Sequence, residues 1–342
     1  MRKKKIKILF RISGGRARNK EYGLGHIYHA MNLAPRLKPT EIFFLVEDYG
    51  KAIDLLQKYN FKNLFSLKKG LDIKSDIDQT IKFVKKNNID ILIVIKHDLI
   101  TKTYVKSMRK HVKTVVISDV RKIDYDADLV INGFIGFENT ITKNKFGIRC
   151  LLGPKYQILN KKYETIKKSN RKKYLILATF GGFDEQNIIQ ILCQQLEIFL
   201  DKIKVKIILG QSTSKSNQVK IIQSKFPKNL EIINETNNLK KEILSSRFGI
   251  CAGGITTYEF ASLGIPFAII CQYKHQLATA REWEKNGLAF NLGFPNKKIN
   301  MKIQKFLKYL IEGNAMNKLE SKHIVDGYGA KRVAKEILNL LH

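Results

Sequence analysis

The sequence lacks any apolar run that approaches the ~20 residues a membrane-spanning helix needs. Cysteine is also scarce: the chain has 342 residues and 4 cysteines, which show no CxxC or metal-like spacing. We therefore expect buried free thiols in a reducing, cytoplasmic setting, without a disulfide framework or a metal site. Arg11 interrupts the short apolar stretch that follows the charged N-terminus, so a signal peptide is not expected. The four cysteines are Cys150, Cys193, Cys251 and Cys271.

Acidic residues are the other shortage. Lys and Arg number 62 against 30 Asp and Glu, which gives a formal net charge of +32. Such an excess is typical of contact with nucleic acid, a membrane surface or an anionic substrate. The basic residues are scattered, with concentrations at Arg2–Lys7 and Lys161–Lys173, and no nucleic-acid-binding signature accompanies them. We expect a solvated basic surface and no nucleic acid partner, and we leave peripheral contact with an anionic membrane open.

The chain reads as alternating strands and helices over a length that suits two domains. Short β-branched apolar runs are separated by amphipathic or charged stretches, which predicts parallel strands joined by right-handed crossovers. The pattern weakens after Gly153-Pro154 and then restarts. The expected strands are Ile6–Phe10, Ile42–Val46, Ile91–Ile95, Thr114–Ile117, Leu129–Ile131, Tyr174–Phe180, Val205–Leu209, Leu230–Ile233, Phe248–Cys251 and Phe267–Ile270, and the expected helices include Gly50–Lys58, Asp76–Lys86, Glu185–Leu200, Asn217–Phe226, Ile255–Leu263 and Gln276–Asn286.

This order predicts an α/β protein with two Rossmann-like, doubly wound domains that face each other across a cleft. We place the N-terminal domain at residues 1–155, a basic linker at 156–173 and the C-terminal domain at 174–342. Whether the last helix, about Ala330–Leu341, crosses back to the first domain is left open. Ligands of open α/β sheets bind at the carboxyl ends of the strands, so the cleft is the expected site.

The most informative segment is Phe248–Glu259, which reads as a buried strand, a glycine turn and a helix start. Glycines let a ligand approach the backbone, and a helix N-terminus suits a phosphate. A carboxylate one turn further would repel phosphate but could accept hydrogen bonds from a ribose diol. The order therefore suggests a nucleoside diphosphate, with a plain strand–turn–helix corner as the alternative. The residues assigned to this site are Gly253, Gly254, Thr256, Thr257 and Glu259.

Two more glycine turns follow the first strand of each domain. One contains Gly181 and Gly182, and the other contains Gly23 and Gly25 followed by His26. Histidine has an ordinary pKa of ~6.5 and can take a proton from water, and a helix N-terminus favours its neutral form. We interpret His26 as a candidate base, with a capping or structural role as the competing interpretation.

Short motifs follow one another along the chain: Gly23-x-Gly-His26, Leu152-Gly-Pro-Lys-Tyr156, Phe180-Gly-Gly-x-Asp184, Ala252-Gly-Gly-x-Thr-Thr-x-Glu259, Leu263-Gly-Ile-Pro266, Gln276 and Asp326-Gly-x-Gly-x-x-Arg332. In this order and spacing, they give the chain a family resemblance. The sequence is similar to the nucleotide-sugar hydrolases of pseudaminic acid synthesis and the related spore-coat polysaccharide proteins. Its second domain is similar to the lipid II-forming N-acetylglucosaminyltransferase, which has the GT-B fold.

The resemblance implies a UDP-sugar in the cleft, in particular an acetamido sugar of nonulosonic acid or surface polysaccharide biosynthesis. It implies that water attacks the anomeric carbon with inversion and releases UDP. It also implies that His26 serves water attack and that Glu259 holds the ribose. The chemistry needs no metal, and no cofactor is expected. The implied diphosphate residues are Gly181, Gly182, Gly253, Gly254, Thr256 and Thr257, and the substrate-side residues are Gly23, Gly25, His29, His275 and Gln276.

Several positions depart from the family pattern, and they leave the reaction open. The family usually carries Arg where this chain has His29, which removes a guanidinium fork for phosphate or carboxylate. A GT-B glycosyltransferase that uses a UDP-sugar donor and an alcohol or lipid-linked acceptor is therefore a second candidate function, and a noncatalytic nucleotide-sugar binder is a third. The remaining departures are Ile255, His275, Arg247 and a longer loop at Ser13–Tyr22 that carries Arg16 and Arg18.

Overall fold

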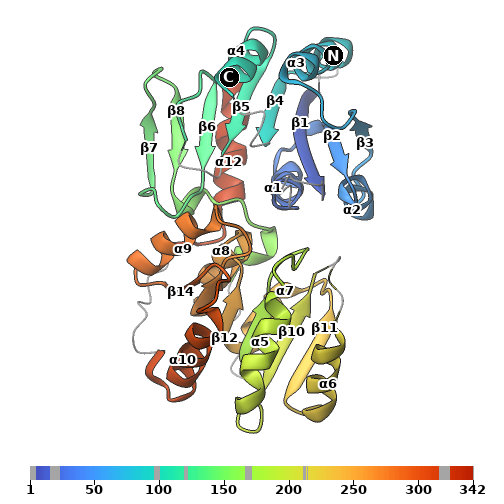
Figure 1. Cartoon of the computed structure of the whole chain (residues 1–342). Coiled ribbons are helices and arrows are strands. Elements are labelled where there is room, and N and C mark those ends of the chain that lie inside the picture. The colour runs from blue at the N-terminus through green and yellow to red at the C-terminus, as the bar shows by residue number, and fades with distance from the viewer. Residues whose placement is uncertain are drawn as a thin grey trace. The chain divides into compact units, whose positions relative to one another are not determined.

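The structure is a computed structural model that describes residues 5–15, 24–95, 101–118, 122–165, 172–210, 213, 215–315 and 324–341. The chain divides into two compact units (Figure 1). The first contains Met1–Lys161 together with Gly327–His342, and the second contains Lys162–Asp326. The division falls inside the segment 156–173 that the sequence pattern indicates as a linker, and the C-terminal segment belongs to the first unit.

The first unit is built on an eight-stranded sheet in the order β3-β2-β1-β4-β5-β6-β8-β7. The strands are parallel except that β7 runs antiparallel to β8. Most of them are buried on both faces, which explains their continuous apolar runs. The strands are β1 (Ile6–Gly15), β2 (Thr40–Tyr49), β3 (Asn63–Ser66), β4 (Ile91–Ile95), β5 (Lys113–Ile117), β6 (Leu129–Asn132), β7 (Thr140–Lys143) and β8 (Arg149–Leu152).

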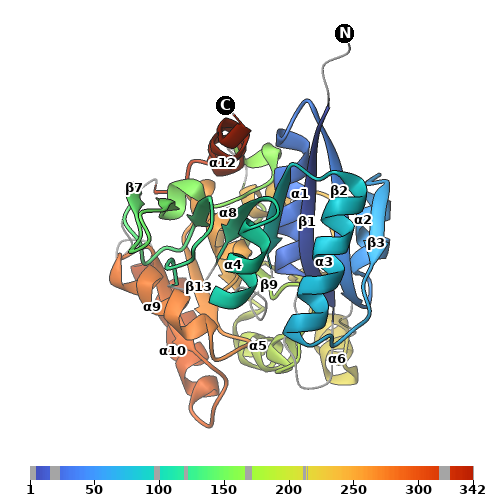
Figure 2. The same cartoon turned by 90° about the horizontal axis from the view of Figure 1, so that it is seen from above.

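Helices cover both faces of this sheet. Helices α3 and α4 pack together on one face of the sheet (Figure 2). On this face, Tyr104 and Met108 join Leu9 and Val94 in a hydrophobic core. Helix α1 contacts β1, and it also packs against α2 and α12. The helices are α1 (Gly25–Leu33), α2 (Ala52–Lys58), α3 (Ile73–Asn87), α4 (Lys102–Arg109) and α12 (Gly329–Leu338).

A buried charge network lies under α3 and α4. Arg11 of β1 is completely buried, and its guanidinium donates to both carboxylate oxygens of Asp76 and to Glu47. Tyr104 adds a hydrogen bond to Asp76. These ion pairs hold the pKa of Arg11 above its ordinary value, although burial alone would lower it. β1 continues to Gly15, beyond the predicted end at Phe10, with Arg11 inside the strand.

The second unit contains a six-stranded parallel sheet in the order β11-β10-β9-β12-β13-β14. Helices α5, α6 and α10 share one core with one face of the sheet. The strands are β9 (Tyr174–Thr179), β10 (Val205–Leu209), β11 (Leu230–Asn234), β12 (Ser246–Cys251), β13 (Phe267–Ile270) and β14 (Ala289–Gly293). The helices are α5 (Ile188–Leu196), α6 (Asn217–Lys225), α7 (Leu239–Leu244), α8 (Ile255–Ser262), α9 (Gln276–Lys285) and α10 (Ile299–Ile311).

All four cysteines are buried and free, as the sequence predicts. Within the described ranges, no helix is long and apolar enough to cross a bilayer.

Candidate functional site

The two predicted glycine turns of the second unit begin side by side. Strands β9 and β12 are hydrogen-bonded neighbours, with Thr179 paired to Cys251. The strand order reverses direction between these two strands, which makes this the topological switch point of the sheet. Phe180-Gly181-Gly182 follows β9 and Ala252-Gly253-Gly254 follows β12. Open α/β sheets bind ligands in the crevice at such a point.

Helix α8 begins at the second of these turns. Gly254 is its N-cap residue, and among the described residues no side chain caps this helix. A Cβ on Gly254 would meet no described atom within 4 Å. The first N–H groups of α8 and the positive end of its dipole therefore lie beside an open approach, the arrangement that suits a phosphate.

The neighbouring helix α5 has its N-terminus occupied. Asp184 accepts hydrogen bonds from the backbone N–H groups of Ile188 at 2.8 Å and Ile189 at 2.9 Å. Burial raises the pKa of Asp184, while these two bonds oppose the rise. A carboxylate already meets the N–H groups of α5, so α8 is the better candidate for an incoming anion.

Two glutamines tie the turns together. Gln276 opens α9, and its Oε1 accepts from the backbone N–H of Gln272 at 2.8 Å. The buried Gln272 side chain donates from Nε2 to the carbonyls of Phe180 and Phe183, and its Oε1 accepts from the Glu185 N–H. The turn after β9 is therefore pinned by a residue that follows β13.

Glu259 lies one helical turn into α8 and is partly buried. Burial is the main cause that raises the pKa of its carboxyl group; interactions with Tyr163, Lys162 and Thr256 oppose the rise. Tyr163, in turn, is fully buried, and burial together with the Glu259 charge raises the pKa of its hydroxyl. Burial therefore disfavours the ionised form of Glu259, and its interactions with neighbouring groups partly offset that cost.

The two threonines of α8 behave differently. The Thr256 hydroxyl favours the ionised form of Glu259 and so opposes the rise of its pKa. Thr257 is completely buried; its hydroxyl donates to the carbonyl of Gly254 at 2.7 Å and accepts from Trp283 Nε1 at 3.1 Å. The Thr257 hydroxyl thus closes the first turn of α8 and holds it to α9, and its contact with phosphate stays a prediction.

An aromatic pair lies beside Gln276. The rings of Tyr273 and His275 stack with centroids 5.5 Å apart and planes 9° apart, and His275 is exposed. The pair follows β13, so it belongs to the same edge of the sheet as the glycine turns.

In the first unit, the predicted base begins a helix. Gly25 and His26 are the first two residues of α1, and within the described part of the chain no side chain caps this helix. Strand β1 lies between β2 and β4, at the switch point of its own sheet. Gly23 and the arginines Arg16 and Arg18 lie outside the described residues.

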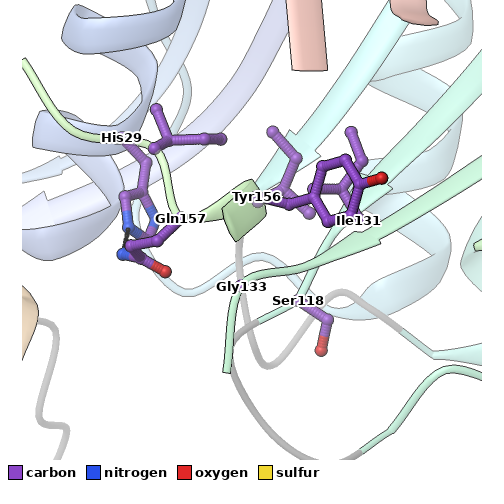
Figure 3. A pocket seen from close by; sticks show the side chains of 8 residues that line it. His29, Ser118, Ile131, Gly133, Tyr156 and Gln157 are labelled. Atoms are coloured by element: carbon purple, nitrogen blue, oxygen red, sulfur yellow. Dashed lines mark hydrogen bonds between the residues drawn. The ribbon is translucent and has the colours of Figure 1, made fainter. Parts of the chain in front are cut away.

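His29 lies one turn further along α1 and is 6% exposed. The Gln157 side-chain amide donates from Nε2 to His29 Nε2 over 3.1 Å, so this ring nitrogen accepts (Figure 3). A cavity of about 10 Å³, room for about one water, lies between them and Ser118. Gly133 allows this contact, since a Cβ there would come within 2.4 Å of Gln157 Oε1. His29 is therefore held inside the first unit, and its contact with substrate stays a prediction.

The structure thus gathers the predicted site residues into two groups. Gly25, His26 and His29 belong to the first unit. The second unit brings together the residues that follow β9, β12 and β13: Gly181, Gly182, Gly253, Gly254, Thr256, Glu259, His275 and Gln276. Sequence reasoning missed Tyr163, Gln272 and Tyr273. Gln272 and Tyr273 stand four and three residues before the predicted Gln276, and that proximity is a signal that could have indicated them.

Comparisons with known proteins agree with this architecture. No protein-family model matches the sequence. The chain is 26% identical over 278 residues to an uncharacterized protein of Methanocaldococcus jannaschii; the match covers 75% of this chain but 54% of that relative, about half its length. It is 25% identical over 345 residues to the spore coat polysaccharide biosynthesis protein SpsG of Bacillus subtilis, covering 94% of this chain and 95% of SpsG.

Solved structures resemble the whole chain. MurG of Acinetobacter baumannii matches with a TM-score of 0.67 at 15% identity, over 97% of this chain and 99% of that one. MnaA of S. aureus, solved with UDP, matches with a TM-score of 0.61 at 16% identity, over 98% and 97%. At these identities the likeness shows the fold. It confirms the predicted α/β class with two Rossmann-like units, of the GT-B type.

Proposed function

We propose that the chain binds a UDP-sugar and hydrolyses it, in nonulosonic acid or surface polysaccharide biosynthesis. One observation carries the nucleotide part: two glycine turns flank the switch point of the second sheet, with the N-terminus of α8 at one of them and Glu259 one turn into the helix. The likeness to SpsG and to the fold of MurG and MnaA supports a substrate of this class.

The proposed binding mode assigns each group a role. The backbone N–H groups at Gly254 and the start of α8 hold the diphosphate, and Gly181 and Gly182 let it approach the adjacent turn. Glu259 accepts hydrogen bonds from the ribose hydroxyls. Gln276 and the Tyr273–His275 pair lie toward the sugar. The second unit thereby supplies the nucleotide contacts of the proposal.

The proposed reaction assigns the base to His26. Its imidazole takes a proton from water as the water oxygen bonds to C1 of the sugar. The bond from C1 to the β-phosphate oxygen breaks, and UDP leaves with the electron pair. Backbone N–H groups stabilise the charge that develops on the diphosphate. A positioned general base typically contributes ~10²–10⁴-fold to the rate.

The test is incubation with a panel of UDP-acetamido sugars, with and without alcohol or lipid-linked acceptors, while UDP release is followed. We expect release without an acceptor. In ¹⁸O-labelled water the label should enter the sugar and not UDP, and the first anomer formed should be inverted. Release that depends on an acceptor would favour a GT-B glycosyltransferase with the same donor. Binding of UDP-sugars without any turnover would favour a noncatalytic binder.

A further inference from the structure

Helix α1 carries His26, and no side chain in the described part of the chain caps this helix. Capping bonds help to fix where a helix begins, so the placement of His26 depends on contacts along the body of α1. His29 and Asn32 follow His26 at intervals of three residues. Residues three apart are neighbours on a helix surface, so whatever holds His29 and Asn32 also sets the position of His26.

The segment that leads out of the first unit, residues 155–160 and here called the exit segment, holds both of these side chains. Gln157 donates from Nε2 to His29 Nε2 over 3.1 Å (Figure 3). Asn160 donates from Nδ2 to Asn32 Oδ1, also over 3.1 Å. The two donors are three residues apart in the chain, and so are the two acceptors. One hydrogen bond would leave α1 free to turn about it, whereas two bonds along the helix fix its rotation.

Neighbouring elements of the first unit support the exit segment in turn. A Cβ on Gly133 would come within 2.7 Å of the Gln157 Cα, and a Cβ on Gly329 would come within 2.1 Å of the Gln157 carbonyl oxygen. Arg332 of α12 donates from Nη1 to the carbonyl of Lys155 at 2.9 Å. Gln157 therefore lies between the turn after β6 and the start of α12, on a support that cannot easily shift.

The Gln157–His29 bond is shielded from water, because the two side chains are 7% and 6% exposed. Since Nε2 of His29 accepts, the ring is neutral and carries its proton on Nδ1. A buried polar pair that is hydrogen-bonded rigidifies its surroundings and specifies one arrangement, whereas an apolar pair would only fill the space. The exit segment and α1 therefore meet in one register.

We propose that Gln157 and Asn160 are positioning residues for the proposed reaction: they hold α1 at the rotation that places the His26 imidazole against the attacking water. The inference rests on the proposed function, because it takes His26 to be the base. Neither residue touches the substrate, and both act through α1. The geometry is demanding, since a displacement of about 1 Å at a reacting group can cost roughly 100-fold in rate.

The test compares Gln157→Met, which keeps the length of the side chain but cannot donate, with Asn160→Ala at a half-buried position. Each should lower kcat of the full chain on a turned-over UDP-sugar by roughly 10- to 100-fold. KM and the UDP dissociation constant should stay within about twofold, because the proposed nucleotide contacts belong to the second unit. A loss in UDP affinity in place of kcat, or a parental kcat in both variants, would overturn the proposal.

A double-variant cycle shows whether the two residues act through His26. In a His26→Asn background, adding Gln157→Met should lower the residual kcat no further; a further loss of the same size would show that Gln157 acts elsewhere. The matched control is Asn63→Ala, which removes a side-chain amide that donates to the Ile42 carbonyl within the same unit. It should leave kcat unchanged. A fall in this control like that of Asn160→Ala would reduce the effect to a general loss of stability and overturn the assignment.

The outcomes separate this inference from the proposed function. If the parent turns over no UDP-sugar, the proposed function fails and this inference fails with it. If His26→Asn abolishes turnover while Gln157→Met and Asn160→Ala keep the parental kcat, only this inference fails. His29→Asn removes the acceptor of the Gln157 bond, so a fall in its kcat without a rise in KM would support the inference.

Discussion

Gln276 lies directly on Gly253: a Cβ added to Gly253 would come within 2.9 Å of the Gln276 Cβ. The neighbouring Gly254 has open space at the same position. The two glycines of this turn therefore have different structural roles. Gly253 allows the turn after β12 to pack against α9, whereas Gly254 leaves the backbone at the start of α8 open to a ligand.

This difference predicts opposite outcomes for two single substitutions. Gly253→Ala forces Gln276 or the turn to shift and should destabilise the protein by about 1–3 kcal/mol, the usual cost of overpacking. Gly254→Ala meets no described atom at this position and should cost at most about 1 kcal/mol of stability, since alanine is a poorer N-cap than glycine. Its methyl group should, however, weaken UDP binding by roughly tenfold, about 1.4 kcal/mol. Denaturant unfolding and calorimetric titration measure the two effects. A stable Gly253→Ala protein, or a Gly254→Ala protein with parental affinity, would contradict the assignment.

His26 gives the second prediction, on catalysis. His26→Asn roughly keeps the shape but cannot take a proton at neutral pH. It should lower kcat on a turned-over UDP-sugar by roughly 10²–10⁴-fold while UDP binding barely changes. The check is steady-state kinetics together with a UDP titration of the same variant.

Three more histidine variants sharpen the His26 test. His111→Asn alters an exposed residue after α4 and should have no effect. His29→Asn and His275→Asn should change KM more than kcat if those residues bind or orient substrate. If His275→Asn abolishes turnover while His26→Asn does not, the base belongs to the second unit.

The sequence predicts the strand–helix alternation and most buried strands, because a strand covered on both faces reads as a continuous apolar run. It misplaces the end of β1, because Arg11 interrupts the run although the structure pairs its charge inside the core. The sequence pattern does not predict the exposed strand β7 or the short strand β3. In β7, Thr140–Lys143 has no buried face, so apolar and polar residues do not alternate.

Part of the candidate site can be predicted, because some of its residues lie close together in the sequence. Gly253, Gly254 and Glu259 form one local motif, so spacing alone indicates them. Tyr163 precedes this motif by about 90 residues, and Gln272 donates to the carbonyl of Phe180, which is also about 90 residues away along the chain. Nothing in the sequence around Gln272 reports this contact. The segment predicted as a basic linker therefore contributes a completely buried side chain.

The Arg11 network gives the third prediction, on stability. Arg11→Met leaves Asp76 and Glu47 buried without their guanidinium and should destabilise the protein by about 3–5 kcal/mol. Combining it with Asp76→Leu should recover part of the loss, because fewer buried charges remain unpaired. Lys225→Met, which removes an ion pair to Glu197 on the surface, should leave the unfolding midpoint nearly unchanged. Equal midpoints for the Arg11 and Lys225 variants in urea would contradict this account.

The last prediction concerns Glu259 and pH. Burial raises the pKa of the Glu259 carboxyl group in the folded protein above its ordinary value of 4.5, although Tyr163 and Lys162 oppose the rise. The same charge adds to the burial that raises the pKa of the Cys251 thiol. Below the ordinary value, Glu259 is protonated in both folded and unfolded states and no charge is buried. As pH rises from the ordinary value to the raised pKa, the unfolded state loses this proton while the folded state keeps it, so stability falls over that interval. The loss is complete above the raised pKa, and Glu259 therefore lowers stability at neutral pH.

Glu259→Gln removes this buried charge while keeping the shape. It should raise the melting temperature near pH 7, because the folded state no longer has to bury an ionised group there. The gain should vanish at about pH 4, where the native side chain is protonated as well. The same variant should bind UDP more weakly, because an amide accepts less strongly from ribose hydroxyls than a carboxylate does. Glu312→Gln, at an exposed position after α10, should show neither effect. A Glu259→Gln protein that is less stable at pH 7, yet binds UDP as the parent does, would assign this carboxylate to the fold and remove it from the nucleotide site.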